Sequence, residues 1–331
     1  MTTAAIFGLL GTELTRAERD FFRSADPWGF ILFARNVDSP DQLRRLTGDL
    51  RDAVGREAIV TIDQEGGRVQ RMRAPHWAEW APPLEDAQLG PQALRLRSHL
   101  IGQELRAVGI DSNCAPTLDI ASDETHSFLQ NRCLGRDVET VVANGRAVAD
   151  GLLAAGVVPI MKHMPGHGRA QVDSHKETPR VTATREALMQ SDFATFRALN
   201  DLPMGMTAHI RFSEIDDAPA TASARMIGVI RDEIGFDGLL MTDDISMNGL
   251  TGSIAARSAA AIRAGCDLVL HCHGQMDEME AVTAEAGQMS DAALRRGEAA
   301  LSARRTPEEI PAAALLAEYR AAGGRVDWPH A

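Results

Sequence analysis

The chain has 331 residues, of which 44% are hydrophobic and 24% charged, a composition that excludes disordered, collagen-like and membrane-spanning chains. Acidic residues outnumber Lys and Arg by 46 to 34, which gives a net charge of −12. Nucleic-acid-binding proteins usually carry a basic surface, so we expect neither nucleic acid nor a membrane as a partner.

Short apolar runs alternate along the chain with longer amphipathic segments. The runs are nearly continuous in Val, Ile, Leu and Met, as expected of parallel strands buried on both faces, and lie at 5–10, 29–33, 58–62, 112–118, 157–161, 204–208, 238–241 and 268–271. Helical spacing of apolar residues occurs at 41–54, 91–108, 138–155, 186–199, 224–234 and 254–264. Ser39-Pro40 supplies an N-cap and a first-turn proline for one of these helices.

About eight strand–helix units in series, with no break in composition, predict one α/β domain over residues 1–331, a (β/α)8 TIM-type barrel. An open doubly wound sheet is the alternative architecture. We expect the residues from about 290 onward to form helices that pack outside the barrel.

The active sites of such barrels lie at the C-terminal ends of the strands, so the residues after each run are candidates. Nearly every run is followed by ionisable residues, and this convergence favours a catalytic site. Each residue also has a structural interpretation: Asp63 could cap a turn, Glu65 could pair with Arg68, and the histidines could be buried core residues. The candidates are Arg35, Asn36, Asp63, Gln64, Glu65, Asp119, Lys162, His163, His167, His209, Asp243, Asp244, His271 and His273.

The loop after the fifth run is the richest in chemistry and leaves three possibilities open. His163 and His167 could bind a metal, although the intervening proline and glycines prevent the helix that would align them, and no further ligand set is evident. Lys162 could form a Schiff base, as in barrel aldolases. Asp173 could orient His175 and stabilise its protonated form, which would make a general acid–base dyad near neutral pH.

Asp243 is the first ionisable residue after the seventh run. A carboxylate at this position can attack an anomeric carbon, or it can cap the following helix. Asp244 is better suited to cap the helix or to support the residues that contact the substrate.

These segments resemble the bacterial β-N-acetylhexosaminidases of glycoside hydrolase family 3. The shared signature is KHMPGHG at 162–168 with DSH at 173–175, supported by GTEL at 11–14, GFILFARN at 29–36, IDQEGGRVQR at 62–71 and TDDISM at 242–247. The resemblance runs in order over about residues 5–275. Met164 replaces the usual phenylalanine and Thr242 a common serine, and both are packing changes.

The resemblance implies a retaining exo-β-N-acetylglucosaminidase that uses no cofactor and no metal. Asp243 would be the nucleophile, and His175, with Asp173 as its partner, would be the general acid and base. This dyad would account for the lack of a second convincing catalytic carboxylate. The residues implied to hold the N-acetylglucosamine unit are Asp63, Arg71, Arg132, Lys162 and His163.

The N-terminal stretch lacks a basic region and its apolar run ends at Glu13, which does not fit a signal peptide. The four cysteines have spacings that fit neither a disulfide scaffold nor a zinc ribbon. We therefore expect a cytoplasmic protein with reduced thiols. We also expect a monomer. By resemblance, its substrate would be a small carbohydrate, a 1,6-anhydro-N-acetylmuramoyl-peptide of peptidoglycan recycling. A phosphorylase, a β-glucosidase or β-xylosidase, and a non-catalytic sugar-binding barrel remain as alternatives.

Overall fold

One parallel sheet organises the computed structural model, which describes residues 2–172 and 177–329. Within those residues the sheet has eight strands, in the order β3-β2-β1-β12-β11-β9-β7-β6. Each predicted apolar run overlaps one of them. The strands are β1 Thr3–Phe7, β2 Pro27–Leu32, β3 Ile59–Ile62, β6 Ser112–Asn113, β7 Val158–Met164, β9 Met204–Thr207, β11 Leu239–Asp244 and β12 Leu268–His271.

Hydrogen bonds also join β3 to the segment that contains β6, the two ends of this strand order. The Asp111 N–H donates to the Val60 carbonyl at 3.1 Å, and the Cys114 N–H donates to the Ile62 carbonyl at 2.9 Å. The Asp111 carboxylate accepts the Val60 N–H at 2.8 Å. The sheet therefore closes on itself, which confirms the barrel and excludes the open doubly wound sheet.

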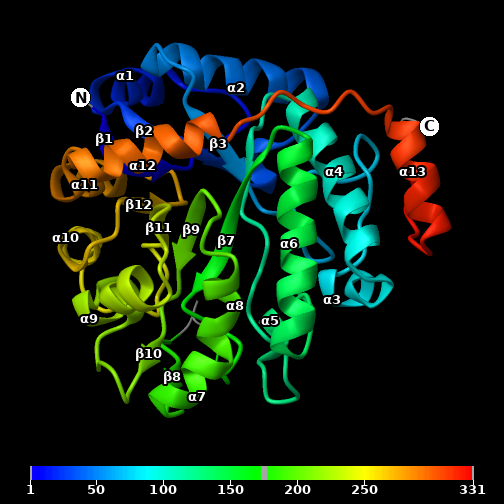
Figure 1. The fold of residues 1–331 in the computed structure, drawn as a ribbon. Coiled ribbons are helices and arrows are strands. Elements are labelled where there is room, and N and C mark those ends of the chain that lie inside the picture. The colour runs from blue at the N-terminus through cyan, green and yellow to red at the C-terminus, as the bar shows by residue number, and fades with distance from the viewer. Residues whose placement is uncertain (1, 173–176, 330–331) are drawn as a thin grey trace.

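Helices alternate with the strands and cover the outside of the barrel (Figure 1). Those that follow successive strands are α1 Arg16–Ala25, α2 Pro40–Val54, α4 Pro91–Ala107, α6 Val138–Ala154, α8 Asp192–Ala198, α9 Ala224–Gly228, α10 Ile254–Ala264 and α11 Met276–Ala286. Shorter elements within the connections are β4 Gln64–Gly66, β5 Val69–Gln70, α3 Pro83–Asp86, α5 Ser127–Gln130, β8 Arg180–Val181, α7 Arg185–Gln190 and β10 Arg211–Phe212.

Helix α2 begins where its sequence predicts. The Ser39 hydroxyl accepts the Gln42 N–H at 3.4 Å, and Pro40 occupies the first helical position, where its missing N–H has no cost. The helix stops at Gly55, whose φ of +66° is a backbone conformation that glycine adopts without strain.

The segment 186–199, predicted as one helix, forms two helices, α7 and α8. Ser191 interrupts them with φ −125° and ψ −91°. Its hydroxyl donates to the Ala187 carbonyl at 2.8 Å, one turn back, and lies 2.7 Å from the Asp192 carboxylate. A serine that bonds to nearby groups competes with the helical backbone bonds, and periodicity alone does not reveal this competition.

The strands are buried on both faces of the sheet. Every residue of β1, β2 and β7 is buried, as predicted for parallel strands between a filled barrel interior and a layer of helices. All four cysteines are buried without disulfides. Among the described helices, none combines the length and the hydropathy needed to cross a bilayer.

Two helices follow the last strand–helix unit, α12 Asp291–Ser302 and α13 Ala312–Ala321. Between them, Arg304 pairs with Asp111 at 2.8 Å, next to the junction of β3 and β6. Helix α13 packs against the outside of α4, where it is the red helix at the edge of the molecule (Figure 1).

Candidate active site

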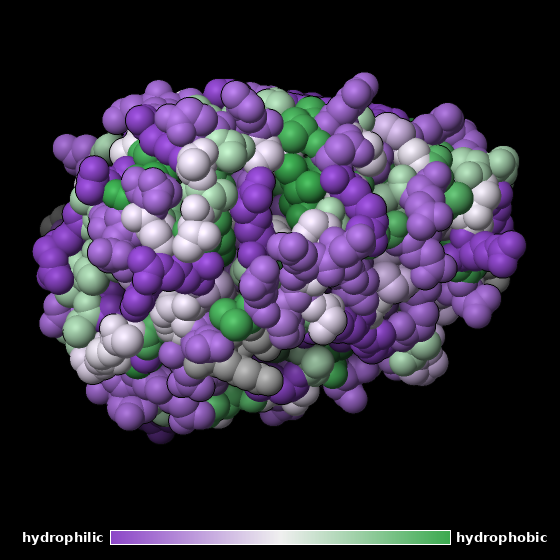
Figure 2. All heavy atoms as spheres, turned by 90° about the horizontal axis from the view of Figure 1, so that it is seen from below, coloured by the Kyte–Doolittle hydropathy of each residue, from purple (hydrophilic) through white to green (hydrophobic). Residues whose placement is uncertain are grey.

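The strands run so that their carboxyl ends open on the lower side of Figure 1. Figure 2 shows that side face on: most of its surface is hydrophilic, and apolar side chains gather in a hollow near the upper centre. Lys162 and His163 belong to β7, Asp243 belongs to β11, and Asp63 directly follows β3. The barrel therefore brings these four predicted site residues to one end.

A short hairpin, β4–β5, follows Asp63 and is fixed by Gln64. The Gln64 side-chain oxygen accepts the N–H groups of Arg71 and Met72 at 2.9 and 3.1 Å. The backbone N–H of Gln64 donates to the side-chain oxygen of Asn113 at 3.0 Å, and this bond connects the hairpin to β6. This arrangement directs Glu65 and Arg71 toward the barrel mouth.

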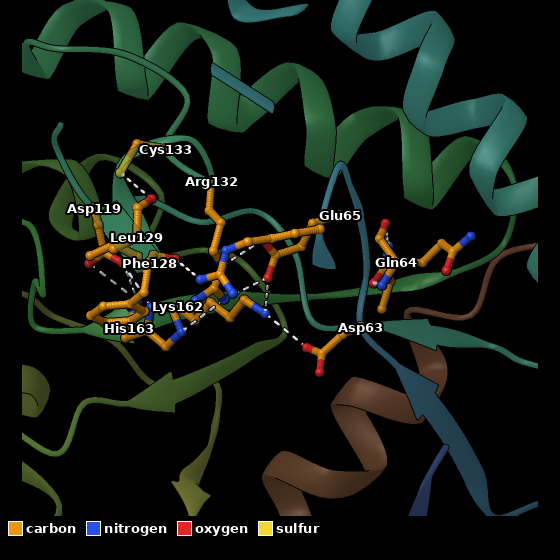
Figure 3. A network of polar contacts seen from close by, with 12 residues as sticks. Asp63, Gln64, Glu65, Asp119, Phe128, Leu129, Arg132, Cys133, Lys162 and His163 are labelled. Atoms are coloured by element: carbon orange, nitrogen blue, oxygen red, sulfur yellow. Dashed lines mark hydrogen bonds and ion pairs between the residues drawn. The ribbon is translucent and has the colours of Figure 1, made fainter. Parts of the chain in front are cut away.

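Five charged side chains then form a network, which we call the binding cluster: Asp63, Glu65, Arg71, Arg132 and Lys162. Glu65, Arg132 and Lys162 are buried, Asp63 and Arg71 are partly exposed, and Figure 3 labels all of them except Arg71. Lys162 Nζ lies 3.0 Å from Asp63 Oδ1 and 2.5 Å from Glu65 Oε1. Arg132 binds Glu65 through two bonds, of 2.9 and 2.7 Å. Arg71 reaches the other oxygen of Asp63 at 2.9 Å. Three cations thus face two carboxylates.

These contacts keep the cluster ionised. Burial alone would raise the pKa of Glu65, but the charges of Arg132 and Lys162 outweigh it and bring that pKa to about 2. Burial would lower the pKa of Lys162, but Asp63 and Glu65 raise it above its usual value. An ammonium group has no lone pair to attack a carbonyl, so the pairing of Lys162 with two carboxylates argues against the Schiff-base interpretation.

His163 contacts the cluster and is oriented by Asp119. Its Nδ1 lies 2.7 Å from Asp119 Oδ2, and its Nε2 lies 3.5 Å from Arg132 Nη2. Asp119 Oδ1 also accepts the N–H of His167 at 2.6 Å, so one carboxylate fixes the start of the loop after β7. Burial opposes the ionisation of Asp119, but His163 and these bonds lower its pKa, and it stays a carboxylate.

His167, in the same loop, is also buried, but its side chain has no evident role in the site. Its ring packs edge-on against Phe128 and His163, with centroids 5.6 and 5.7 Å away. Within the described part of the chain, neither ring nitrogen has a hydrogen-bond partner. Burial, followed by the nearby His163, lowers its pKa to about 4, so the ring is neutral at pH 7. Residues 2–172 and 177–329 contain no group of three or more His, Cys, Asp or Glu side chains that could hold a metal.

We expect the free energy of unfolding to rise with pH between about 4 and 6.5 because of His167. Its folded pKa is depressed from 6.5 to about 4, so in this window the unfolded chain binds a proton that the folded protein does not. The contribution is at most about 3 kcal/mol, complete above pH 6.5 and lost as the pH falls through 4. Urea unfolding of His167→Asn from pH 4 to 7 should show a flatter dependence than the wild type. Equal slopes would contradict the assignment.

At the end of β11, the two adjacent aspartates have different surroundings. The Asp244 carboxylate accepts the Ser246 hydroxyl at 2.7 Å and the N–H groups of Ser246 and Cys272 at 3.1 and 3.2 Å. Its carbonyl lies 2.9 Å from Nε2 of the buried His209. Asp243 is half-buried, and its Oδ1 accepts the Asp244 N–H at 2.8 Å. Asp244 therefore caps a turn, as its sequence position indicates.

Asp173 and His175, the predicted dyad, lie outside the described residues. The sequence-based pairing of Glu65 with Arg68 is wrong, because Glu65 pairs with Arg132 and Lys162, and Arg68 donates to the Phe128 carbonyl. The orienting role of Asp119 was not predicted. The position of Asp119 directly after a predicted strand was the available signal. Its partner, His163, is 44 residues away in the sequence, so the pair could not be predicted without the arrangement of the strands in the barrel.

Residues 12–300 match the N-terminal domain of glycosyl hydrolase family 3. The chain belongs to glycosyl hydrolase family 3. It is therefore a glycoside hydrolase, and its curated relatives agree: a β-hexosaminidase of Bordetella avium is 36% identical over 279 residues, which cover 80% of this chain and 78% of the relative.

Solved structures show the same likeness. NagZ from Neisseria gonorrhoeae superposes with a TM-score of 0.84 at 26% identity, over 97% of this chain and 96% of that one. A family 3 β-N-acetylglucosaminidase from Paenibacillus superposes with a TM-score of 0.81 at 29% identity, over 97% of this chain. That match covers 62% of the Paenibacillus protein, which is the longer of the two.

Proposed function

We propose that the protein is a retaining exo-β-N-acetylglucosaminidase, which removes a terminal β-linked N-acetylglucosamine through a covalent glycosyl–enzyme. The observation that carries this proposal is the ion-paired binding cluster at the mouth of the barrel, at the same end of the strands as Asp243, the penultimate residue of β11. The names of the relatives support this sugar, and one NagZ structure from Neisseria gonorrhoeae is a complex with N-trifluoroacetyl-D-glucosamine.

The cluster has the chemistry to hold a sugar. Charged donors and acceptors make stronger hydrogen bonds to hydroxyl groups than neutral ones do. Because Asp63 is paired with Arg71 and Lys162, and Arg132 is paired with Glu65, little ordering is needed when a sugar binds. His163, fixed through Asp119, adds a neighbouring ring nitrogen. These five residues are our sugar-binding set.

Asp243 attacks the anomeric carbon and forms a covalent bond, while His175 protonates the departing oxygen. In the second step His175 takes a proton from water, and the water oxygen attacks the same carbon, displaces the Asp243 carboxylate and restores the configuration. Asp173 orients His175. Glu65 and Asp119, the nearby buried carboxylates, have lowered pKa values and hold no proton to donate, which supports a histidine in this role.

For the natural substrate we propose 1,6-anhydro-N-acetylmuramoyl-peptides that carry N-acetylglucosamine, hydrolysed during peptidoglycan recycling by a cytoplasmic monomer. The proposal needs no metal and no cofactor. It rests on the resemblance of the signature loop and on the likeness to NagZ.

Release of p-nitrophenol from its β-N-acetylglucosaminide, compared with the β-glucoside and the β-xyloside, tests the proposal. We expect a kcat/KM at least about 10²-fold higher for the N-acetylglucosaminide, because a site built for an amide group rejects analogues that lack it. A preference for either other sugar would contradict the assigned specificity. Acceleration by phosphate, with a sugar phosphate as product, would indicate a phosphorylase, and absence of a single turnover would indicate a binding protein.

Excess EDTA should leave the rate of this reaction unchanged, because His163 is oriented by Asp119 and assigned to the sugar, and the described residues contain no group of three or more side chains that could hold a metal. The control is the same assay after removal of the chelator, with added zinc or manganese. Activity that falls with EDTA and returns with either metal would support a metal-dependent hydrolase instead.

A further inference from the structure

We propose that Tyr319, on the C-terminal helix α13, is a positioning residue for the binding cluster and acts through Asp86 and Arg97. Tyr319 is the only tyrosine of the chain, its side chain is fully buried, and it lies outside the segment 12–300 that matches the family. The inference rests on the proposed function, because the role of the cluster in sugar binding is part of that proposal.

The first contact joins α13 to α3, which lie far apart in the sequence. The Tyr319 hydroxyl donates to Asp86 Oδ2 at 2.7 Å in a buried setting. The ring packs edge-on against Trp80, at 5.8 Å between centroids, and directly against Gly324, where an added Cβ would lie 2.3 Å from the ring. Burial, followed by the bond to Asp86, raises the pKa of Tyr319, which therefore remains a donor across the neutral range.

The second contact, between Asp86 and Arg97, connects Tyr319 to the β4–β5 hairpin of the site. Arg97 is 2% exposed, and its Nε lies 3.2 Å from the same oxygen of Asp86. Its Nη2 donates to the carbonyls of Glu65 and Ala81 at 2.8 and 2.7 Å. A Cβ at Gly66 would lie 2.0 Å from this nitrogen, so the guanidinium is packed directly on the hairpin backbone.

Glu65 is thus held at both ends. Arg97 fixes its carbonyl, and Arg132 and Lys162 fix its carboxylate. Without the Tyr319 hydroxyl, Asp86 keeps Arg97 as its charged partner but loses the bond that sets its orientation. Supporting contacts of this kind decide how precisely a binding group is placed. Substrate binding should therefore weaken, while the chemistry at Asp243 is unaffected.

The test is Tyr319→Phe, which removes one oxygen and keeps the ring. We expect KM for the p-nitrophenyl β-N-acetylglucosaminide to rise about 3- to 10-fold, with kcat within about twofold, the signature of lost ground-state binding. The inhibition constant of N-acetylglucosamine should rise by the same factor. The matched control is Leu316→Ala, which removes a buried side chain from the same helix that is not part of the Tyr319–Asp86–Arg97 path and should lower the melting temperature without changing KM.

A second variant tests whether the effect passes through Asp86. Asp86→Asn keeps an oxygen for the tyrosine hydroxyl but removes the charge that faces Arg97, so KM should rise at least as much. If Tyr319 acts only along this path, the double variant should show the KM of Asp86→Asn alone.

Unchanged KM and inhibition constants in Tyr319→Phe, in a protein that hydrolyses the substrate, would overturn the inference and leave the proposed function standing. Equal KM increases in Tyr319→Phe and Leu316→Ala would also overturn it, because α13 would then act only through stability. A wild type that neither hydrolyses the glycoside nor binds N-acetylglucosamine would overturn both proposals.

Discussion

Asp243→Ala should reduce kcat/KM on the p-nitrophenyl β-N-acetylglucosaminide by about 10⁴-fold or more, as expected when a hydrolase loses its nucleophile. The fold should persist, because the side chain is half-buried at the end of β11 and outside the apolar core. Activity and the thermal unfolding midpoint of the same preparation measure the two effects. Asp244→Ala is the neighbouring control: it removes the acceptor of three hydrogen bonds and should mainly lower stability.

A trapping experiment identifies the nucleophile directly. A 2-fluoro or 5-fluoro sugar with a good leaving group should accumulate as a covalent adduct on the peptide that contains Asp243. An adduct on Asp244 would contradict our assignment of the two neighbours. An adduct on neither residue, with activity retained, would contradict the covalent mechanism.

His175→Ala should show the second-largest loss, and its size should depend on the leaving group. General acid catalysis contributes about 10²–10⁴-fold, and a leaving group of low pKa needs little protonation. Activity on alkyl or natural glycosides should therefore fall by this factor, and activity on activated aryl glycosides should fall less. Because His175 also acts as the base in the second step, the covalent intermediate should accumulate.

Azide should partly restore the turnover of His175→Ala, because it attacks the intermediate without base assistance and yields a β-glycosyl azide. Asp173→Asn should show a milder form of the same defect. Near-wild-type rates on both substrate types would instead make the dyad structural. Of the other acid–base candidates, Glu65 and Asp119 are ionised by their partners, so His167 would be the next residue to test.

The barrel could be predicted from the sequence because its signal is local and repeated. Buried parallel strands need apolar residues on both faces, and each run shows this within a few residues. The break at Ser191 escaped prediction because it depends on where one hydroxyl donates, whereas the apolar spacing of 186–199 continues across it. The start of α2 was predictable because Ser39 and Pro40 act on the backbone next to them.

The residues of the candidate site also fall into those with a local signal in the sequence and those without one. Lys162 and Asp243 were found because they come just after apolar runs that predict strands, and a barrel brings the carboxyl ends of its strands together. Arg132 follows no apolar run and was assigned through the family resemblance alone. The partner of Glu65 was misassigned because Arg68 is near in sequence, whereas Arg132 is 67 residues away and approaches only when the barrel closes. The bond between Tyr319 and Asp86 spans 233 residues and has no local signal.

The junction between β3 and β6 limits which substitutions at the site the fold can accept. Few backbone hydrogen bonds cross it, but the ion pairs of Glu65 with Arg132 and of Asp63 with Lys162 connect residues that follow β3 to residues beyond β6. Removing one partner of a buried ion pair typically costs about 3–5 kcal/mol. The charges that we propose to bind the sugar therefore also connect the two ends of the sheet, and a substitution at these positions that changed sugar specificity would have to be accompanied by new contacts across that junction.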